Sequence, residues 1–212
     1  DFRPPRRSYL SNSRKEMVYF KQIAEAPVEG LDVEEGMVAM RTVYKPILVN
    51  LKNNQEKEIN QQIDSAGLVF SPNDSEIAWI KQIDEATYQK IEQSGKKREL
   101  WISKLNGDEA RLLASFDENL ILLQRWSNDY IYFQGIWDVN TRSMGRINVK
   151  TKEIDYVVPR DCEKFLENCN NIEFSPLGKN FLYEIVSEKE SKKITILYLG
   201  DFEKKEFLEI LT

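Results

Sequence analysis

Residues 68–80 read LVFSPNDSEIAWI, and residues 99–113 read ELWISKLNGDEARLL. Each apolar run is short and rich in β-branched and aromatic residues, which is typical of strands. The runs are interrupted by turn signals, Ser-Pro-Asn-Asp in the first stretch and Asn-Gly in the second. The two stretches therefore predict four short antiparallel strands, at residues 67–70, 76–81, 99–105 and 109–115.

This pattern recurs along the chain. Two further copies read LQRWSNDYIYFQGIW (123–137) with GRINVKTKEIDYVV (145–158), and IEFSPLGKNFLYEIV (172–186) with KITILYLGDFEKKEFLEIL (193–211). A degenerate copy precedes them, with MVAMRT at 37–42 and KPILVNLKNNQEKEI at 45–59. When the copies are aligned on the strand before the second turn, four residues occupy equivalent positions: Leu51, Leu105, Val149 and Leu199. They follow one another at intervals of 54, 44 and 50 residues. These intervals are near the period of four-stranded propeller blades.

The motif F-S-P-x-D/G-x-x-I-A-W/F, followed by L-W-I-x-x-L-N-G-x-x-x-R-L-L, resembles the TolB-type β-propeller repeat, a relative of the WD-type blade. Phe70-Ser71-Pro72 and Phe174-Ser175-Pro176 match its most recognisable element. The middle copy has Trp126-Ser127-Asn128 there, and the first copy has Leu31-Asp32-Val33. The resemblance covers about residues 28–211. It implies an all-β β-propeller of four-stranded antiparallel blades, with four to five blades in view, either complete or part of a larger ring.

The domain organisation that we predict is a basic flexible arm at 1–16 followed by propeller repeats at 17–212. The approximate blades are 28–63, 66–115, 120–158 and 170–211. Residues 1–15 carry five basic side chains and one acidic one, a net charge of +4, whereas the remaining 197 residues carry a net charge of −9. An acidic body argues against nucleic-acid binding. No run approaches the ~20 apolar residues that a membrane-spanning helix needs.

Cys162 and Cys169 are the only two cysteines. A disulfide between them would be typical of an exported protein, so we expect a periplasmic, cell-surface or secreted location. In one unbroken helix the two residues would lie roughly 10 Å apart, so a bridge requires the chain to fold back near Asn168. Two free thiols on one helix face, and with them a cytoplasmic location, stay open as the alternative.

Side chains for catalysis or metal binding are scarce. The sequence has no histidine, which excludes His-dependent triads and His metal ligands. Two cysteines fall short of the four ligands of a usual zinc site. Acidic pairs such as Glu34-Glu35 and Asp117-Glu118 are interpreted as solvated surface. We therefore expect neither an enzyme nor a bound cofactor or metal.

The connections between strands are unequal in length. Strands that alternate in direction send the first and third turns of a blade to one side, and its second connection and the link to the next blade to the other. The long connections, at 82–98, 134–144, 159–171 and 187–192, all belong to the second side. Binding residues concentrate on loops held by a rigid scaffold, so this side is the candidate interaction surface.

The richest of these loops reads QGIWDVNTR and supplies the candidate contacts, Trp137, Asp138, Asn140 and Arg142. An exposed tryptophan beside such polar groups suits a protein or glycan contact. The alternative is that Trp137 folds inward and holds its own loop. The predicted function is a non-enzymatic propeller module that binds a protein or other macromolecule. The second hypothesis is the substrate-gating propeller of a larger prolyl-oligopeptidase-like hydrolase. The sequence does not define an oligomeric state.

Overall fold

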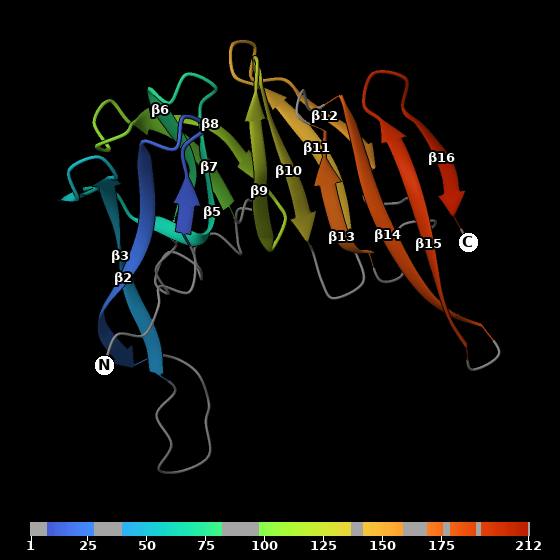
Figure 1. The fold of residues 1–212 in the computed structure, drawn as a ribbon, viewed down its shortest axis with the longest axis horizontal. Helices are drawn as coiled ribbons and strands as arrows, with labels where there is room; N and C mark the ends of the chain where they lie inside the picture. The colour runs from blue at the N-terminus through green and yellow to red at the C-terminus, as the bar shows by residue number, and fades with distance from the viewer. Residues whose placement is uncertain are drawn as a thin grey trace. The chain divides into compact units, whose positions relative to one another are not determined.

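The computed structural model describes residues 8–27, 40–81, 98–136, 142–158, 169–175, 179–189 and 192–211. The strands of these residues form four antiparallel sheets of four strands each (Figure 1). In every sheet the strands are hydrogen-bonded in chain order, so each sheet is an up-and-down meander. We call the strands of each sheet A, B, C and D in that order. The sequence prediction of all-β structure in four-stranded antiparallel sheets is confirmed.

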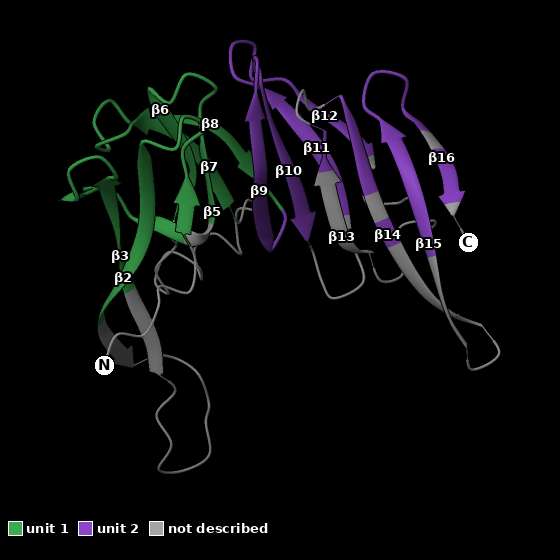
Figure 2. Cartoon of the chain, viewed as in Figure 1, with its two compact units in different colours: residues 1–117 green, residues 118–212 purple. Residues whose placement is uncertain are grey.

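Two compact units divide the chain, at residues 1–117 and 118–212 (Figure 2). The first unit holds two sheets. Its first sheet consists of β1 (Ser8–Leu10), β2 (Glu16–Pro27), β3 (Met40–Asn50) and β4 (Gln55–Glu58). Its second sheet consists of β5 (Ile63–Phe70), β6 (Glu76–Lys81), β7 (Arg98–Lys104) and β8 (Arg111–Phe116).

The second unit has the same organisation. Its first sheet consists of β9 (Leu120–Ser127), β10 (Tyr130–Ile136), β11 (Arg142–Asn148) and β12 (Ile154–Val158). Its second sheet consists of β13 (Cys169–Phe174), β14 (Asn180–Lys189), β15 (Lys192–Asp201) and β16 (Glu206–Leu211). None of the described residues forms a helix that is long and apolar enough to cross a membrane.

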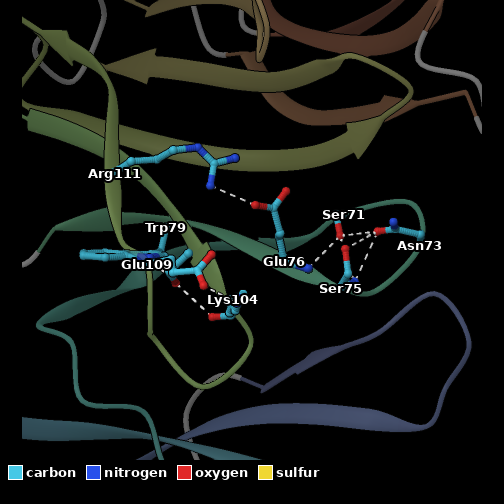
Figure 3. Close-up of polar contacts among 9 residues, drawn as sticks. Ser71, Asn73, Ser75, Glu76, Trp79, Lys104, Glu109 and Arg111 are labelled. Carbon is cyan, nitrogen blue, oxygen red and sulfur yellow. Dashed lines mark hydrogen bonds and ion pairs between the residues drawn. The ribbon is translucent and has the colours of Figure 1, made fainter.

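A serine closes the A–B turn in three of the four sheets. In the second sheet the Ser71 N–H donates to the Glu76 carbonyl at 2.9 Å, and the Glu76 N–H donates to the Ser71 hydroxyl at 3.0 Å. Asn73 accepts hydrogen bonds from the hydroxyls of Ser71 and Ser75, an Asx-type turn that Figure 3 shows. Asp74 follows with a φ of 56°, a conformation that Asp tolerates better than most residues. The sequence Ser-Pro-Asn-Asp therefore folds as its turn chemistry predicts.

The first sheet begins earlier than the sequence prediction placed it. Ser11 makes the same turn as Ser71, since its N–H donates to the Glu16 carbonyl and its hydroxyl accepts from the Glu16 N–H. Residues 8–16, expected to belong to a flexible arm, thus form β1, the A–B turn and the first residue of β2. The repeat element of the first copy is Leu10-Ser11-Asn12, while Leu31-Asp32-Val33 lies outside the described residues. The start of the first copy was placed too late because its turn lacks proline and follows an Arg- and Pro-rich stretch.

Aromatic and aliphatic side chains pack between the two sheets of the first unit. Trp79 is 2% exposed, stacks on Trp101 at a centroid distance of 5.9 Å, and donates its indole N–H to the Ser103 hydroxyl. Trp79 therefore belongs to the core of the first unit. The buried cluster consists of Val18, Phe20, Ile59, Ile63, Leu68, Phe70, Ile77 and Trp79. Burying side chains of this size contributes about 1.5–3 kcal/mol each to the free energy of folding.

The second unit has an equivalent core in which aromatic rings dominate. Tyr132 packs edge-on against Phe202 at 5.1 Å, and Phe181 meets Phe202 at the same distance. The fully buried Phe202 follows β15 directly, so the turn between β15 and β16 contributes a side chain to the cluster. The other buried members are Met144 and Val157.

Candidate partner-binding face

Topology assigns the connections of each sheet to two opposite ends. A–B and C–D turns leave one end, and B–C connections and D–A links leave the other, which we call the long-connection end. The A–B and C–D turns are short, as at residues 71–75, 105–110, 128–129 and 149–153. The B–C connections span 28–39, 82–97, 137–141 and 190–191. The B–C connection is therefore the longest connection in the two sheets of the first unit, and in the third sheet it has the same length as the C–D turn.

The predicted contact loop is shorter than the sequence suggested. β10 continues to Ile136 and β11 starts at Arg142, and these two residues face each other across the ladder. The loop is thus 137–141 rather than 134–144. Trp137, Asp138 and Asn140 lie outside the described residues, and of Arg142 only the backbone is described. Their role as contacts stays a prediction.

The expected long connection at 187–192 is instead an extended hairpin. β14 and β15 stay paired as far as Lys189 opposite Lys192, which leaves residues 190–191 between them. In this register the backbone of Glu188 stands opposite that of Lys193. The first sheet is extended in the same way, since β2 and β3 stay paired as far as Pro27 opposite Met40. Hairpins thus build part of the long-connection end.

Glu118 is fully buried at the loop end of the β10–β11 hairpin. Its Oε1 accepts a hydrogen bond from the Tyr156 hydroxyl at 3.0 Å. A Cβ on Gly135 would lie 2.8 Å from Oε1 and 2.5 Å from the Ser143 hydroxyl, so only glycine leaves room for this carboxylate. The interpretation of Asp117-Glu118 as solvated surface is wrong for Glu118. The signal that was available is Gly135, since a glycine inside an apolar strand often marks a close approach.

A pocket of about 490 Å³ opens in the first unit, at the end of β4. Its lining includes the D–A link at 59–62 and Lys81, the last described residue before the second B–C connection. The Gln61 amide donates to the Gly107 carbonyl at 2.8 Å, which fastens the link to the neighbouring C–D turn. Sequence reasoning did not find this pocket, because its walls come from segments far apart in the chain.

The two cysteines are not brought together by anything that the structure describes. Cys162 lies outside the described residues, and Cys169 is the first residue of β13. Their disulfide therefore stays a prediction. Among the described residues, no group of three or more Cys, Asp or Glu side chains is arranged to hold a metal ion.

The sequence matches no protein-family model and no curated protein. Solved structures do resemble the fold. TolB from Acinetobacter baumannii superposes with a TM-score of 0.60 at 10% identity, over 97% of this chain and 42% of TolB. The β-propeller domain of the Trilobed protease from Pyrococcus furiosus gives 0.59 at 12% identity, over 99% of this chain and 59% of the other.

An oligogalacturonate lyase in complex with manganese gives a TM-score of 0.59 at 16% identity, over 99% of this chain and 54% of the lyase. The chain therefore has a TolB-type β-propeller fold, as the repeat motif implied. It spans between 42% and 59% of the length of these three structures.

Proposed function

We propose that this chain, which has a TolB-type β-propeller fold, is a non-enzymatic binding module for a protein partner. The observation that carries the proposal is that the connections between strands differ in length. The two sheets of the first unit place their longest connection at the long-connection end, and two of the four B–C hairpins, one in each unit, are also extended there. Ordering extra residues costs conformational entropy, and a bound partner is one reason for a fold to keep them.

The 137–141 loop is the contact that we propose at this end. Tryptophan and arginine carry a large share of the energy in protein interfaces, and this loop and its flank hold Trp137 and Arg142. Asp138 and Asn140 add hydrogen-bonding groups beside them. Glu118, Gly135 and Ser143 pack tightly beneath the loop, one residue pair from the end of the β10–β11 ladder, which supports a rigid platform for the loop.

A second candidate function is the propeller part of a larger peptidase. It is favoured by the likeness to the β-propeller domain of the Trilobed protease, of which this chain covers 59%. The partial coverage also supports four sheets that belong to a larger propeller. In this candidate a separate domain would perform the hydrolysis, because the chain has no histidine for a Ser-His-Asp triad.

The test is capture of partners with matched variants. The chain is immobilised, exposed to an extract of the cells that produce it, and the retained proteins are identified by mass spectrometry. We expect a protein whose affinity falls by about 1–3 kcal/mol when Trp137→Ala and Arg142→Ala are combined. The control combines Lys150→Ala and Lys204→Ala in C–D turns and should retain that protein unchanged.

Two outcomes would contradict the proposal. If the loop variant unfolds, Trp137 belongs to a core; if it binds the partner normally, the loop is not the contact. The full gene separates the two candidates, since a hydrolase domain encoded with this chain supports the peptidase. An exported location would follow from a disulfide between Cys162 and Cys169.

A further inference from the structure

Strand β3 (Met40–Asn50) extends well beyond its neighbour β4 (Gln55–Glu58). β4 pairs only with Ile47–Asn50, and beyond that point the Ile59 N–H donates to the Pro46 carbonyl at 3.0 Å. In the part of the chain that the structure describes, no strand pairs with the β4 side of residues 40–45. An unpaired strand edge of this kind is a template for one more strand.

The backbone groups along this edge alternate between its two sides. The Pro46 carbonyl points to the β4 side, whereas the Leu51 N–H donates to Lys15 beside β2. Even-numbered residues of β3 therefore face the β4 side, and odd-numbered ones face β2. Thr42 and Tyr44 accordingly offer their N–H and C=O groups to the open edge, in line with β4.

The pocket at the end of β4 lies on this line. Its lining combines the buried Ile59 and Trp79 with Ile23, which is 48% exposed, and with Tyr44 on the open edge itself. A volume of about 490 Å³ falls within the range of about 300–1,000 Å³ that is typical of ligand sites. The pocket can thus receive an apolar side chain from a segment that runs along the edge.

The residues that line the pocket carry a more positive net charge than the chain as a whole. The charged residues of the lining are Lys45, Lys81 and Glu58, whereas the whole chain carries a net charge of −5; Glu99, which pairs with Lys81, is not part of the lining. The Lys45 Nζ and Glu58 Oε1 are 2.7 Å apart, but both side chains are more than 40% exposed. Exposed ion pairs contribute only about 0–1 kcal/mol, so an incoming carboxylate can compete for the lysine.

Lys81 has a defined position beside the apolar floor of the pocket. Its Nζ lies 5.6 Å from the centre of the Trp101 ring and 3.4 Å from Glu99 Oε2. Trp79 and Lys81 are two residues apart on β6, so they lie on the same face of that strand. A bound strand would meet this pair with two of its own residues at the same spacing.

We propose that this groove binds an extended acidic polypeptide segment by strand addition to Thr42 and Tyr44. An apolar side chain of the segment enters the pocket above Trp79, and an acidic side chain two residues away pairs with Lys81. This inference rests on the proposed function, because it names a polypeptide partner and a second contact, which lies in the first unit. Backbone pairing provides affinity in this mode, and the pocket and the lysine provide specificity.

The test is a selection of random dodecapeptides displayed on phage against the whole chain. We expect enriched peptides with an apolar and an acidic residue two positions apart. For a synthetic peptide of the enriched sequence, Lys81→Gln and Ile23→Asp should each weaken binding at least about tenfold. The matched controls Lys150→Gln and Leu208→Asp change an exposed lysine and an exposed leucine of the second unit. They should leave the affinity unchanged.

Amide hydrogen exchange gives an independent measurement. The bound peptide should slow exchange at the Thr42 and Tyr44 amides far more than at Val43 and Lys45, whose amides already face β2. Unchanged exchange at Thr42 and Tyr44, or enrichment of peptides without acidic residues, would overturn the inference. Peptide binding that is lost with Trp137→Ala but kept with Lys81→Gln would also overturn it while leaving the proposed function intact.

Discussion

Asp74 binds Asn12 through two hydrogen bonds. Its Oδ1 accepts from the Asn12 backbone N–H at 2.8 Å and from the Asn12 side-chain amide at 3.0 Å. The Asn12 amide donates in addition to the Ser71 carbonyl at 2.8 Å, and Asp74 Oδ2 accepts from the Ser13 N–H at 2.7 Å. These bonds join the A–B turns of the two sheets in the first unit. One carboxylate thus connects two repeats of the chain.

We expect Asp74→Asn to destabilise the chain by about 1–2 kcal/mol at neutral pH, because hydrogen bonds to a charged acceptor are the stronger ones. Asparagine is the informative replacement, since it tolerates the positive φ of this position whereas alanine would add strain. Urea denaturation of both proteins measures the difference. Equal free energies of unfolding would show that the charge of Asp74 contributes nothing.

The same carboxylate predicts a pH dependence. Partial burial raises the pKa of Asp74, but the hydrogen bonds from Ser13 and Asn12 outweigh this effect and hold the pKa below its usual value. A lowered pKa in the folded state contributes stability that is complete above the unfolded pKa of about 3.9 and is lost as the pH falls through the folded value. The stability difference between the native chain and Asp74→Asn should therefore shrink in acid. A difference that stays constant from neutral to strongly acidic pH would contradict the assignment.

Gly135→Ala should destabilise the second unit by about 1–3 kcal/mol, since the added Cβ would lie 2.5 Å from the Ser143 hydroxyl and 2.8 Å from Glu118 Oε1. Ser143→Ala removes one of these two clashes, and no described residue hydrogen-bonds to that hydroxyl. The double variant should therefore recover part of the loss. A double-mutant cycle by thermal unfolding measures the coupling, and simple additivity would contradict the packing.

The sequence predicted the strands well where turn chemistry is local. The residue types of Ser71-Pro72-Asn73 and Ser175-Pro176 are enough to predict a turn at each place. The sheets that contain these turns have the expected four strands. The burial of Glu118 was not predictable in that way. It depends on Gly135 and Tyr156, which are brought beside it only by the folded sheet. An acidic pair in a link between strands has the composition of solvated surface until those partners are known.

Arg146→Lys should cost about 1–2 kcal/mol despite the retained charge. The Arg146 guanidinium lies 4.5 Å from the centre of the Tyr130 ring and donates through two of its nitrogens to Asp155 Oδ2. Lysine provides neither the flat group for the ring nor the paired donors. Lys150→Ala is the control, because its ion pair with Asp129 is exposed and should contribute only about 0–1 kcal/mol. Equal losses in the two variants, measured by urea denaturation, would contradict this assignment.

The redox state of Cys162 and Cys169 can be measured directly. If they are bridged, closing a loop of eight residues contributes about 2–3 kcal/mol by restricting the unfolded chain. Thiol titration of the unreduced, unfolded protein should then find no free thiol, and a reducing agent should lower the melting temperature. Combined Cys162→Ser and Cys169→Ser should melt at the temperature of the reduced native chain. Two free thiols in protein prepared without reductant would exclude the bridge, and with it the main reason to place the protein outside the cytoplasm.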